Sequence, residues 1–498
     1  MASGRVIAVI DVGSNSVRLL VARTLTQTAF EVVDEEKFEA RLGERAGGLP
    51  LSGSAMDRGL RALRLTRQIA ASYGASPLVA VGTEALRRAP NADEFIARVA
   101  QETGVAIRIV SAQEEAYASF LGVVNSIAID SGRILDIGGG SAELIDVQRR
   151  SFAGAQSAPL GALYACDRFL SSDPASKKEI RLLRKAVRQE FETTSDGAAL
   201  VGVGGAVRNL ARVVRIRSKY PLRRLHGLQI GRAEIHRLAT SLAALSGSDR
   251  RKVAGVSSSR SDILHAAAIV LDEVMDMTGA ATLTVAGQGL REGLVWQDLR
   301  PEAPVLPDVR AASIAGLTRA NAVDEMAAEP VASVAATLFD VLRHQHELGD
   351  EDAGLLVTAA RLAGVGLHVD YYSRDRHAEY LVQSGDLHGF THREIVLLGA
   401  LVRCADSGSP DLAPFSKLLQ SADSRRITML ASILGVARAV RRRVPSPVLG
   451  VHFELQRSAL VVHLAGRGPL DAEEIALERQ QRRFESAFGL GLIVSVSD

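Results

Sequence analysis

The sequence predicts an α/β protein built from two similar lobes, with a helical domain and a small α+β domain after them. The first observation is a strand that ends in aspartate and turns through glycine, and it occurs twice, as AVIDVGSNSVRLLV and as RILDIGGGSAELIDV. The second is a change of composition beyond the proline-rich stretch 300–307, where long Ala, Leu and Val segments are typical of helices. The expected domains are 1–126, 127–303, 304–444 and 445–498.

The first lobe alternates short apolar runs with helical periodicity, which is the pattern of an α/β unit. A helix is expected over 55–73, where Leu60, Leu63 and Ile69 lie near one face and arginines lie opposite. The strands that we expect around this helix are 6–10, 17–22, 79–82 and 107–110.

The second lobe repeats this order, with a hairpin over 134–147 and then a helix over 177–193. Two further strand-turn-helix junctions follow, at 199–212 and 283–295, and each places backbone N–H groups where they can meet a polyanion. The small domain that closes the chain is expected to hold a hairpin of VLGVHFELQ and ALVVHLAGR, a helix over 470–488 and a strand over 492–496.

Composition limits the kinds of partner. The 498 residues carry a formal net charge of +2, so attraction for a polyanion has to come from local clusters. The two cysteines lie far apart, and no apolar run suits a signal peptide or a membrane span, so we expect a cytoplasmic protein without nucleic-acid or membrane partners. Basic clusters, which are more often solvated faces, are Arg215, Arg217, Lys219, Arg223 and Arg224, and Arg438, Arg441, Arg442 and Arg443.

The two glycine loops are candidate phosphate sites. A strand that turns through glycine leaves backbone N–H groups unpaired and pointing the same way, which makes a cradle for phosphate oxygens. Asp11 and Asp136 cannot bind phosphate themselves, but each can hold a divalent cation that bridges to phosphate. A single loop of this kind is as often a capped glycine turn, whereas two copies of the same polarity favour two lobes that grip phosphate from both sides.

A helix start at 111–124 supplies the catalytic candidate. Ser111 and Glu114 have the spacing of a capping box, which engages Glu114 with the backbone at the helix start. Glu115, about 100° further round the helix, stays free to accept a proton from water. A carboxylate at this position can also serve only to complement the helix dipole, so both interpretations of Glu115 stay open on spacing alone.

Six motifs stand in one order along the first three hundred residues: IDVGSNSVRLLV, GTEALRRAPN, EEAYASFLGV, LDIGGGSAEL, GVGGAVRNLA and GQGLREGL. They resemble the exopolyphosphatase/guanosine pentaphosphatase family of the actin and sugar-kinase fold. The resemblance implies two ribonuclease-H-like (actin-like ATPase) lobes and removal of terminal phosphate from inorganic polyphosphate or guanosine pentaphosphate. It also implies Mg²⁺, with Mn²⁺ as a substitute and a monovalent cation such as K⁺ as a further cofactor, and a homodimer.

The resemblance also assigns roles by position. Glu115 matches the family's catalytic base, and Arg87 matches a clamp on phosphate. The implied cation ligands are Asp11, Asp136 and Glu143. The implied phosphate-binding residues are Gly13, Ser14, Asn15, Ser16, Gly138, Gly139, Gly140, Ser141, Gly204 and Gly205.

The chain departs from the family pattern in two places. Ala206 stands where Thr is usual, which removes one hydroxyl near the third glycine turn and disfavours a dedicated nucleotide role. Residues 304–444 resemble an HD-like domain, but Ala363 and Gly364 replace its His-acid doublet, so we expect a non-catalytic domain that binds polyphosphate or shapes a channel and a dimer interface. Six histidines of this region are expected to be structural or on the surface: His344, His346, His368, His377, His388 and His392.

An exopolyphosphatase with Glu115 activating water is the function that these observations favour. The alternative is a guanosine pentaphosphate phosphohydrolase, for which a chain with few aromatic residues offers few stacking platforms. A kinase of the same fold would have to exclude water, and the glutamate of the EEA motif argues against it. A non-catalytic nucleotide-binding regulator ranks last, because every candidate residue of the site is present.

Overall fold

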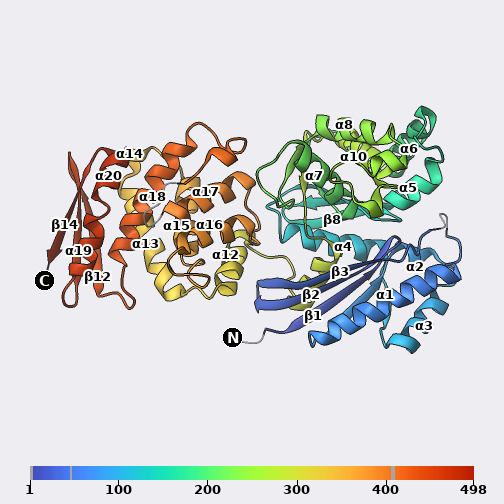
Figure 1. The fold of residues 1–498 in the computed structure, drawn as a ribbon, viewed down its shortest axis with the longest axis horizontal. Coiled ribbons are helices and arrows are strands. Elements are labelled where there is room, and N and C mark those ends of the chain that lie inside the picture. The colour runs from blue at the N-terminus through green and yellow to red at the C-terminus, as the bar shows by residue number, and fades with distance from the viewer. Residues whose placement is uncertain (1–3, 45–47, 405–409, 498) are drawn as a thin grey trace. The chain divides into compact units, whose positions relative to one another are not determined.

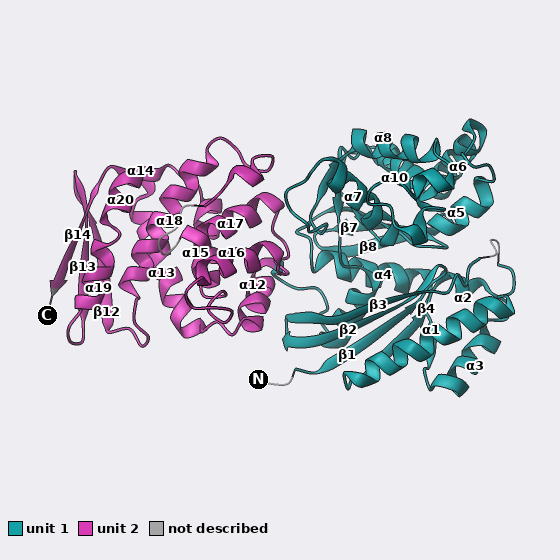
Figure 2. Cartoon of the chain, viewed as in Figure 1, with its two compact units in different colours: residues 1–309 teal, residues 310–498 magenta. Residues whose placement is uncertain are grey.

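The computed structural model describes residues 4–44, 48–404 and 410–497. The chain forms two compact units, residues 1–309 (unit 1) and 310–498 (unit 2), which Figure 2 shows in different colours. Both lobes expected before residue 303 lie in unit 1. The helical and α+β domains expected after it lie in unit 2, apart from residues 304–309.

The first lobe is a five-stranded sheet with helices packed against it. Its elements are β1 (Val6–Val12), β2 (Ser16–Thr26), β3 (Ala29–Glu39), α1 (Gly53–Ser72), β4 (Leu78–Gly82), α2 (Glu84–Arg88), α3 (Ala92–Thr103) and β5 (Ile107–Ile109). The sheet order is β3-β2-β1-β4-β5, with antiparallel pairs up to β1 and parallel pairs beyond it. Strand β3 is absent from the predicted strands because a charged edge strand that faces water lacks an apolar alternation.

The second lobe repeats this topology. Its strands are β6 (Gly132–Ile137), β7 (Ala142–Gln148), β8 (Ser151–Ala158), β9 (Leu200–Val203), β10 (Gln229–Gly231) and β11 (Thr282–Val285). The order β8-β7-β6-β9-β11 has the same directions as β3-β2-β1-β4-β5, and β10 adds an antiparallel strand at the edge. Its helices are α5 (Ala162–Phe169), α6 (Lys177–Glu190), α7 (Gly205–Arg217), α8 (Arg232–Ala243), α9 (Gly247–Arg250) and α10 (Leu264–Thr278), with a 3₁₀ turn at Ser258–Arg260.

Two helices lie between the lobes, α4 (Ala112–Val124) and α11 (Leu290–Leu299), and each follows the last parallel strand of its lobe. Figure 1 shows α4 between the two sheets. The helices cross closely because glycine stands at the contact: a Cβ atom on Gly293 would overlap the carbonyl of Ala118, and one on Gly122 would overlap the carbonyl of Gly289. This crossing fixes the helix that carries Glu115.

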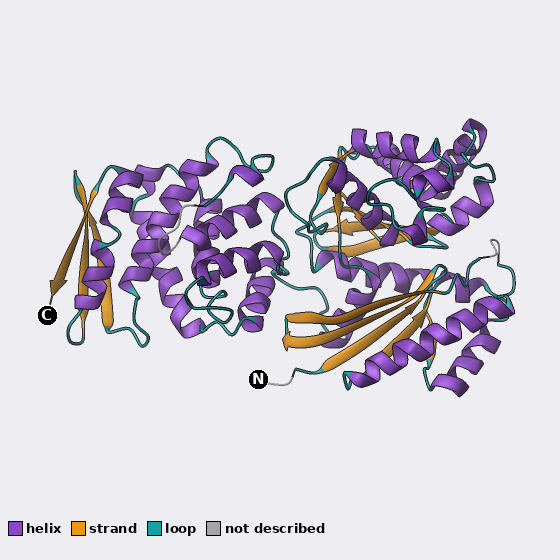
Figure 3. Ribbon diagram, viewed as in Figure 1, coloured by secondary structure: helices purple, strands orange, loops and turns teal. Residues whose placement is uncertain are grey.

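Unit 2 combines a helical bundle with a three-stranded sheet, as the colours of Figure 3 show. The helices are α12 (Val309–Ala320), α13 (Glu325–Val341), α14 (Arg343–His346), α15 (Asp350–Leu362), α16 (Arg374–Ser384), α17 (His392–Cys404) and α18 (Asp423–Val440), with a 3₁₀ turn at Ala413–Phe415. The sheet has the order β12-β13-β14, and one apolar core runs from the helices into it. Its elements are β12 (Val448–Leu455), β13 (Ala459–Gly466), α19 (Asp471–Glu478), α20 (Gln481–Phe488) and β14 (Gly491–Ser497).

The predicted fold class is confirmed, while one expected element differs. The single helix predicted over 470–488 is wrong in detail, because the chain forms α19 and α20 with a turn at Arg479 and Gln480. The N–H of Gln480 donates to the carbonyl of Leu477, three residues back, so the regular four-residue spacing of helix bonds is interrupted there. Within the described residues, none of the helices combines the length and the apolar character that crossing a membrane would need.

Candidate active site

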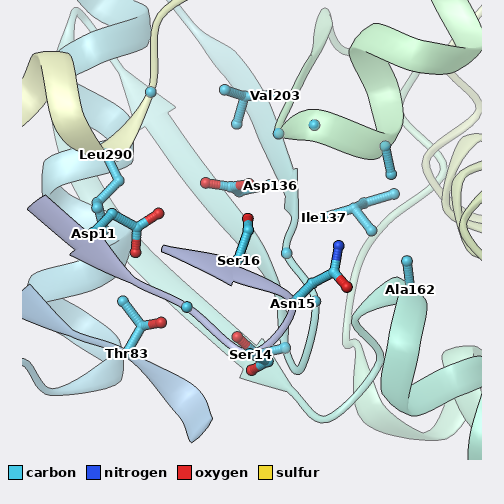
Figure 4. Close-up of a pocket in the computed structure, with 18 of the residues that line it drawn as sticks. Asp11, Ser14, Asn15, Ser16, Thr83, Asp136, Ile137, Ala162, Val203 and Leu290 are labelled. Atoms are coloured by element: carbon cyan, nitrogen blue, oxygen red, sulfur yellow. The ribbon is translucent and has the colours of Figure 1, made fainter. Parts of the chain in front are cut away.

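A pocket lies between the two lobes of unit 1, at the ends of the strands that carry the glycine loops. The structure brings together there all ten predicted loop residues of the three glycine turns, together with Glu115 and the three predicted cation ligands. Figure 4 shows the carboxylates of Asp11 and Asp136 pointing into the same space from the two lobes.

The two phosphate loops share one local geometry. The N–H of Gly13 donates to the carbonyl of Ser16 at 3.1 Å, and the N–H of Gly138 donates to the carbonyl of Ser141 at 3.0 Å. The loops also touch each other, because a Cβ atom on Gly140 would lie 2.5 Å from Ser14 Oγ. Glycine is therefore required where the loops meet, and the second loop cannot carry side chains into the pocket at this point.

The repeated hairpins differ in one charge. In the first lobe, Asp11 stands opposite Arg18 across the β1–β2 pair, whereas in the second lobe Asp136 stands opposite Glu143 across the β6–β7 pair. Equivalent strand positions thus supply a cation from one lobe and an anion from the other. The pocket consequently has an acidic side and a basic side, which a phosphate ester or anhydride with a bound cation would match.

The acidic side holds one buried carboxylate, Glu143, and three partly buried ones, Asp11, Glu115 and Asp136, and several of them raise one another's pKa. Burial is the main cause that raises the pKa of Glu115, and with the lowering effect of Arg87 and the raising effects of Asp11 and Asp136 the pKa lies at about 8. Burial also raises the pKa of Asp11, of Asp136 and of Glu143, and Glu115 and Asp136 add to the rise at Glu143. Crowded buried acids of this kind are typical of sites that bind a cation or move a proton.

The helix start places Glu115 as the sequence predicts. Ser111 Oγ accepts the N–H of Glu114 at 3.2 Å, and a Glu114 carboxylate oxygen accepts the N–H of Ser111 at 2.8 Å, so the predicted capping box is confirmed. The side chain of Glu115 lines the pocket instead. From the same helix, the Ser119 hydroxyl donates to Asp136 at 2.6 Å, which holds that carboxylate in place.

Arg87 lies beside Glu115 and is not among the residues that line the pocket. Its guanidinium donates to Glu115 at 3.0 Å, to Glu84 at 2.8 Å and to the carbonyl of Val110 at 2.8 Å. The bonds to Glu84 and Val110 hold the guanidinium, and its contact with Glu115 lowers the pKa of that carboxyl against the effect of burial. The structure thus brings Arg87 to the predicted base, and its role as a phosphate clamp stays a prediction.

The basic side contains arginines that the sequence did not single out, namely Arg18, Arg208, Arg260 and Arg291. Burial and the neighbouring guanidinium groups lower the pKa of Arg18 to about 9 and that of Arg260 to about 10. Arg291 pairs with Glu35 at 2.6 Å, whereas no carboxylate in the described parts of the chain pairs with Arg18, Arg208 or Arg260. Three cations without an anionic partner line a pocket that would receive an anion.

Gly205 makes this basic side possible. A Cβ atom on Gly205 would overlap the guanidinium of Arg260 and lie 2.6 Å from Arg18 Nη2. The neighbouring Gly204 has φ +99°, a conformation that side chains rarely adopt, and lies against the carboxylate of Asp136. Three of these four arginines could have been found from the motifs. Arg208 lies in GVGGAVRN, Arg291 lies in GQGLREGL and Arg18 lies in the first hairpin. Arg260 lies in none of the motifs.

A divalent cation fits the acidic side, because the carboxylates of Asp11, Asp136 and Glu143 line the same pocket and burial raises the pKa of each. Among residues 4–44, 48–404 and 410–497, no three His, Cys, Asp or Glu residues are grouped closely enough to hold a metal ion by themselves. Mg²⁺ usually takes one or two carboxylates and completes its shell with water and substrate phosphates. Asp11 and Asp136 suit that arrangement.

The fold and the pocket define the class of protein: a two-lobed enzyme whose pocket between the lobes carries glycine loops, arginines and a partly buried carboxylate, a set that suits phosphate chemistry. A family model described as the Ppx/GppA phosphatase family matches residues 20–302, and a second model, Ppx/GppA phosphatase, domain III, matches residues 309–463. The chain belongs to the Ppx/GppA phosphatase family and is a hydrolase of phosphoanhydride bonds. The resemblance seen in the motifs is confirmed.

Solved structures share the fold of unit 1. An exopolyphosphatase from Cytophaga hutchinsonii ATCC 33406 is 24% identical, with a TM-score of 0.54, and the match covers 61% of this chain and 100% of that one. The Aquifex aeolicus member of the Ppx/GppA family is 24% identical, with a TM-score of 0.52, and the match covers 60% of this chain and 99% of that one.

Proposed function

We propose that this protein is an exopolyphosphatase that releases terminal orthophosphate from inorganic polyphosphate, with Glu115 as the general base. The observation that carries the proposal is the pocket itself, which partly buried Glu115 lines together with glycine loops and three arginines that pair with no carboxylate among the described residues. A chain of phosphates needs several cations and N–H groups along it, and this pocket offers both. The solved exopolyphosphatase with the same fold adds support for this substrate class.

The reaction is a displacement at phosphorus by water. The carboxylate of Glu115 accepts a proton from the water as its oxygen bonds to the terminal phosphorus, and the bond from that phosphorus to the bridging oxygen breaks. The products are orthophosphate and a chain shorter by one phosphate, and Glu115 afterwards releases its proton to solvent. When bound, a divalent cation held by Asp11 and Asp136 supplies positive charge that stabilises the phosphate oxygens.

The arginines at and beside the pocket have two further roles, phosphate binding and positioning of Glu115. Arg18, Arg208 and Arg260 would hold the phosphate oxygens, since guanidinium groups bind them in bidentate fashion. Arg87 acts through Glu115 as a positioning residue, because it holds this carboxylate and favours its ionised form.

The first test is phosphate release by Glu115→Gln. The amide keeps the shape of the side chain and cannot accept the proton, so we expect a loss of at least about a hundredfold in kcat, the usual contribution of a general base. The assay supplies long-chain polyphosphate and guanosine pentaphosphate separately with Mg²⁺. The matched control is Glu94→Gln, an exposed glutamate on α3.

Each outcome has a clear meaning. Loss of release from polyphosphate in Glu115→Gln, with normal release in Glu94→Gln, supports the proposal. Full activity of Glu115→Gln would remove Glu115 from the mechanism. A strong preference of the wild type for guanosine pentaphosphate would move the substrate assignment to that nucleotide, although no aromatic side chain lines the pocket among the described residues.

A further inference from the structure

Unit 2 contains a cavity much larger than the pocket of unit 1. Its volume is about 1290 Å³, against about 110 Å³ for the pocket between the lobes by the same measure. Small residues form part of its wall, among them Ala360, Ala363, Gly364 and Ala439. Ligand sites of small molecules are typically of several hundred Å³, so this space can take more than a single phosphate ion.

The lining of this cavity is strongly basic. It includes eight arginines and a single acidic residue, Asp324. The carboxylate of Asp324 is already used, because it accepts the N–H of Met326 at the start of α13. An anionic ligand is therefore the chemical class that the cavity favours.

Only part of this positive charge is compensated. Arg443 pairs with Glu473 at 2.6 Å. Arg442, Arg479 and Arg482 are exposed and line the cavity, and none of the carboxylates that the structure describes pairs with them. Cations are favoured after the carboxyl end of a helix, which accounts for the arginines after α18 and for Arg479 after α19, but not for Arg482 in the first turn of α20. Their convergence on one hollow points to a ligand with more than one phosphate.

Another part of the cavity wall is aromatic and apolar. Tyr371 is 63% exposed and Leu367 is 51% exposed, and both line the cavity. The guanidinium of Arg374 lies 4.8 Å from the centroid of the Tyr371 ring. An inorganic phosphate chain has no group that would use these surfaces, whereas a nucleobase stacks on an aromatic ring and on arginine.

We propose that the cavity of unit 2 binds a nucleotide with two or more phosphates, separately from the catalytic pocket. The phosphates lie among Arg442, Arg479 and Arg482, and the base packs on the wall of Tyr371. The site takes phosphate through guanidinium groups. This inference goes beyond the proposed function and does not rest on it, because every residue that carries it belongs to unit 2.

The test is isothermal titration of the full chain with GDP, ADP and pyrophosphate, which carry the same two phosphates with and without a nucleoside. The cavity variant is Arg442→Ala/Arg479→Ala/Arg482→Ala. The control variant removes three exposed arginines of unit 2 that lie outside the cavity, Arg425→Ala/Arg457→Ala/Arg467→Ala, and so matches the change of charge. A third variant is Tyr371→Ala.

We expect the dissociation constant of GDP or ADP to rise at least about tenfold in the cavity variant and to stay unchanged in the control. Tyr371→Ala is expected to weaken nucleotide binding by about tenfold, the effect of removing one stacking ring, and to leave pyrophosphate binding unchanged. Equal nucleotide affinity in the cavity and control variants would overturn the site. Pyrophosphate binding as tight as nucleotide binding would overturn the base contact.

Two further measurements separate a loss of nucleotide binding from a loss of stability and from a loss of hydrolase activity. Thermal unfolding of the triple variants is expected to coincide, because all six arginines are exposed, and Arg479→Ala alone offers a milder change. Phosphate release from tripolyphosphate is measured in the same variants. If the proposed hydrolase activity fails in the wild type, the difference in nucleotide binding between cavity and control variants still decides this inference.

Discussion

The pKa of Glu115 is decided by its immediate surroundings. Burial and the negative charges of Asp11 and Asp136 raise this pKa, Arg87 lowers it, and the net value is about 8. Because the folded-state pKa lies above the ordinary value of 4.5, the protonated form stabilises the fold at low pH, and this stabilisation is lost as pH rises towards about 8. The base must be ionised to accept a proton, so activity is expected to rise with pH over the same window.

Replacing Arg87 tests its positioning role through this pH dependence. Arg87→Met removes the cation that lowers the pKa of Glu115, so the acid limb of the pH profile of kcat should move up by about one pH unit, as expected for loss of an adjacent opposite charge. The control is Arg98→Met, an exposed ion-paired arginine on α3. An unshifted limb, with lowered activity at every pH, would mean that Arg87 has no influence on the ionisation of Glu115.

Gly205 offers a second test at the scale of one residue. In Gly205→Ala, the added methyl group overlaps the guanidinium of Arg260, so this side chain and Arg18 must move away from the pocket. We expect the KM for polyphosphate to rise by about tenfold or more, the cost of losing one charge-assisted contact. Gly231→Ala, where nothing lies within 4 Å of the added carbon, is the control. Equal KM values in the two variants would argue against phosphate binding by these arginines.

At the scale of elements, the crossing of α4 and α11 decides where the base lies. The two helices follow equivalent strands of the two lobes, and only glycine permits their close approach. Helix α4 carries Glu115 towards the pocket and Ser119 towards Asp136, so a shift of this helix displaces both. Packed helix pairs of this kind move as units, because their interfaces tolerate little change of volume.

A methyl group at the crossing should therefore affect both stability and activity. In Gly293→Ala the new carbon overlaps the carbonyl of Ala118, and such overpacking typically lowers the free energy of unfolding by about 1–3 kcal/mol. Gly354→Ala, in α15 with nothing within 4 Å, should instead stabilise by about 0.5–1 kcal/mol because alanine favours helix. Denaturant unfolding measures both; an unchanged stability in Gly293→Ala would show that the helices can separate at no cost.

At the scale of the whole molecule, local clustering of charge explains how a nearly neutral chain holds charged sites. The formal net charge is +2, yet unit 1 gathers acids against arginines in one pocket and unit 2 gathers arginines around another. Equivalent hairpins place Asp11 and Asp136 in matching positions, and the residue opposite each aspartate changes from Arg18 in the first lobe to Glu143 in the second. Local clustering, rather than total charge, sets which anions each unit attracts.

The sequence by itself determined the features that depend on neighbours along the chain: the repeated loops, the capping box that leaves Glu115 free, and the change of character after residue 300. These follow because turns, caps and periodicity are local. Only the tertiary structure decided which arginines meet the glycine loops, that Arg87 pairs with Glu115, and that segments between Asn321 and Arg483 line one cavity. Such groups come from distant segments, and their contacts are set by packing of whole elements, which no local pattern records.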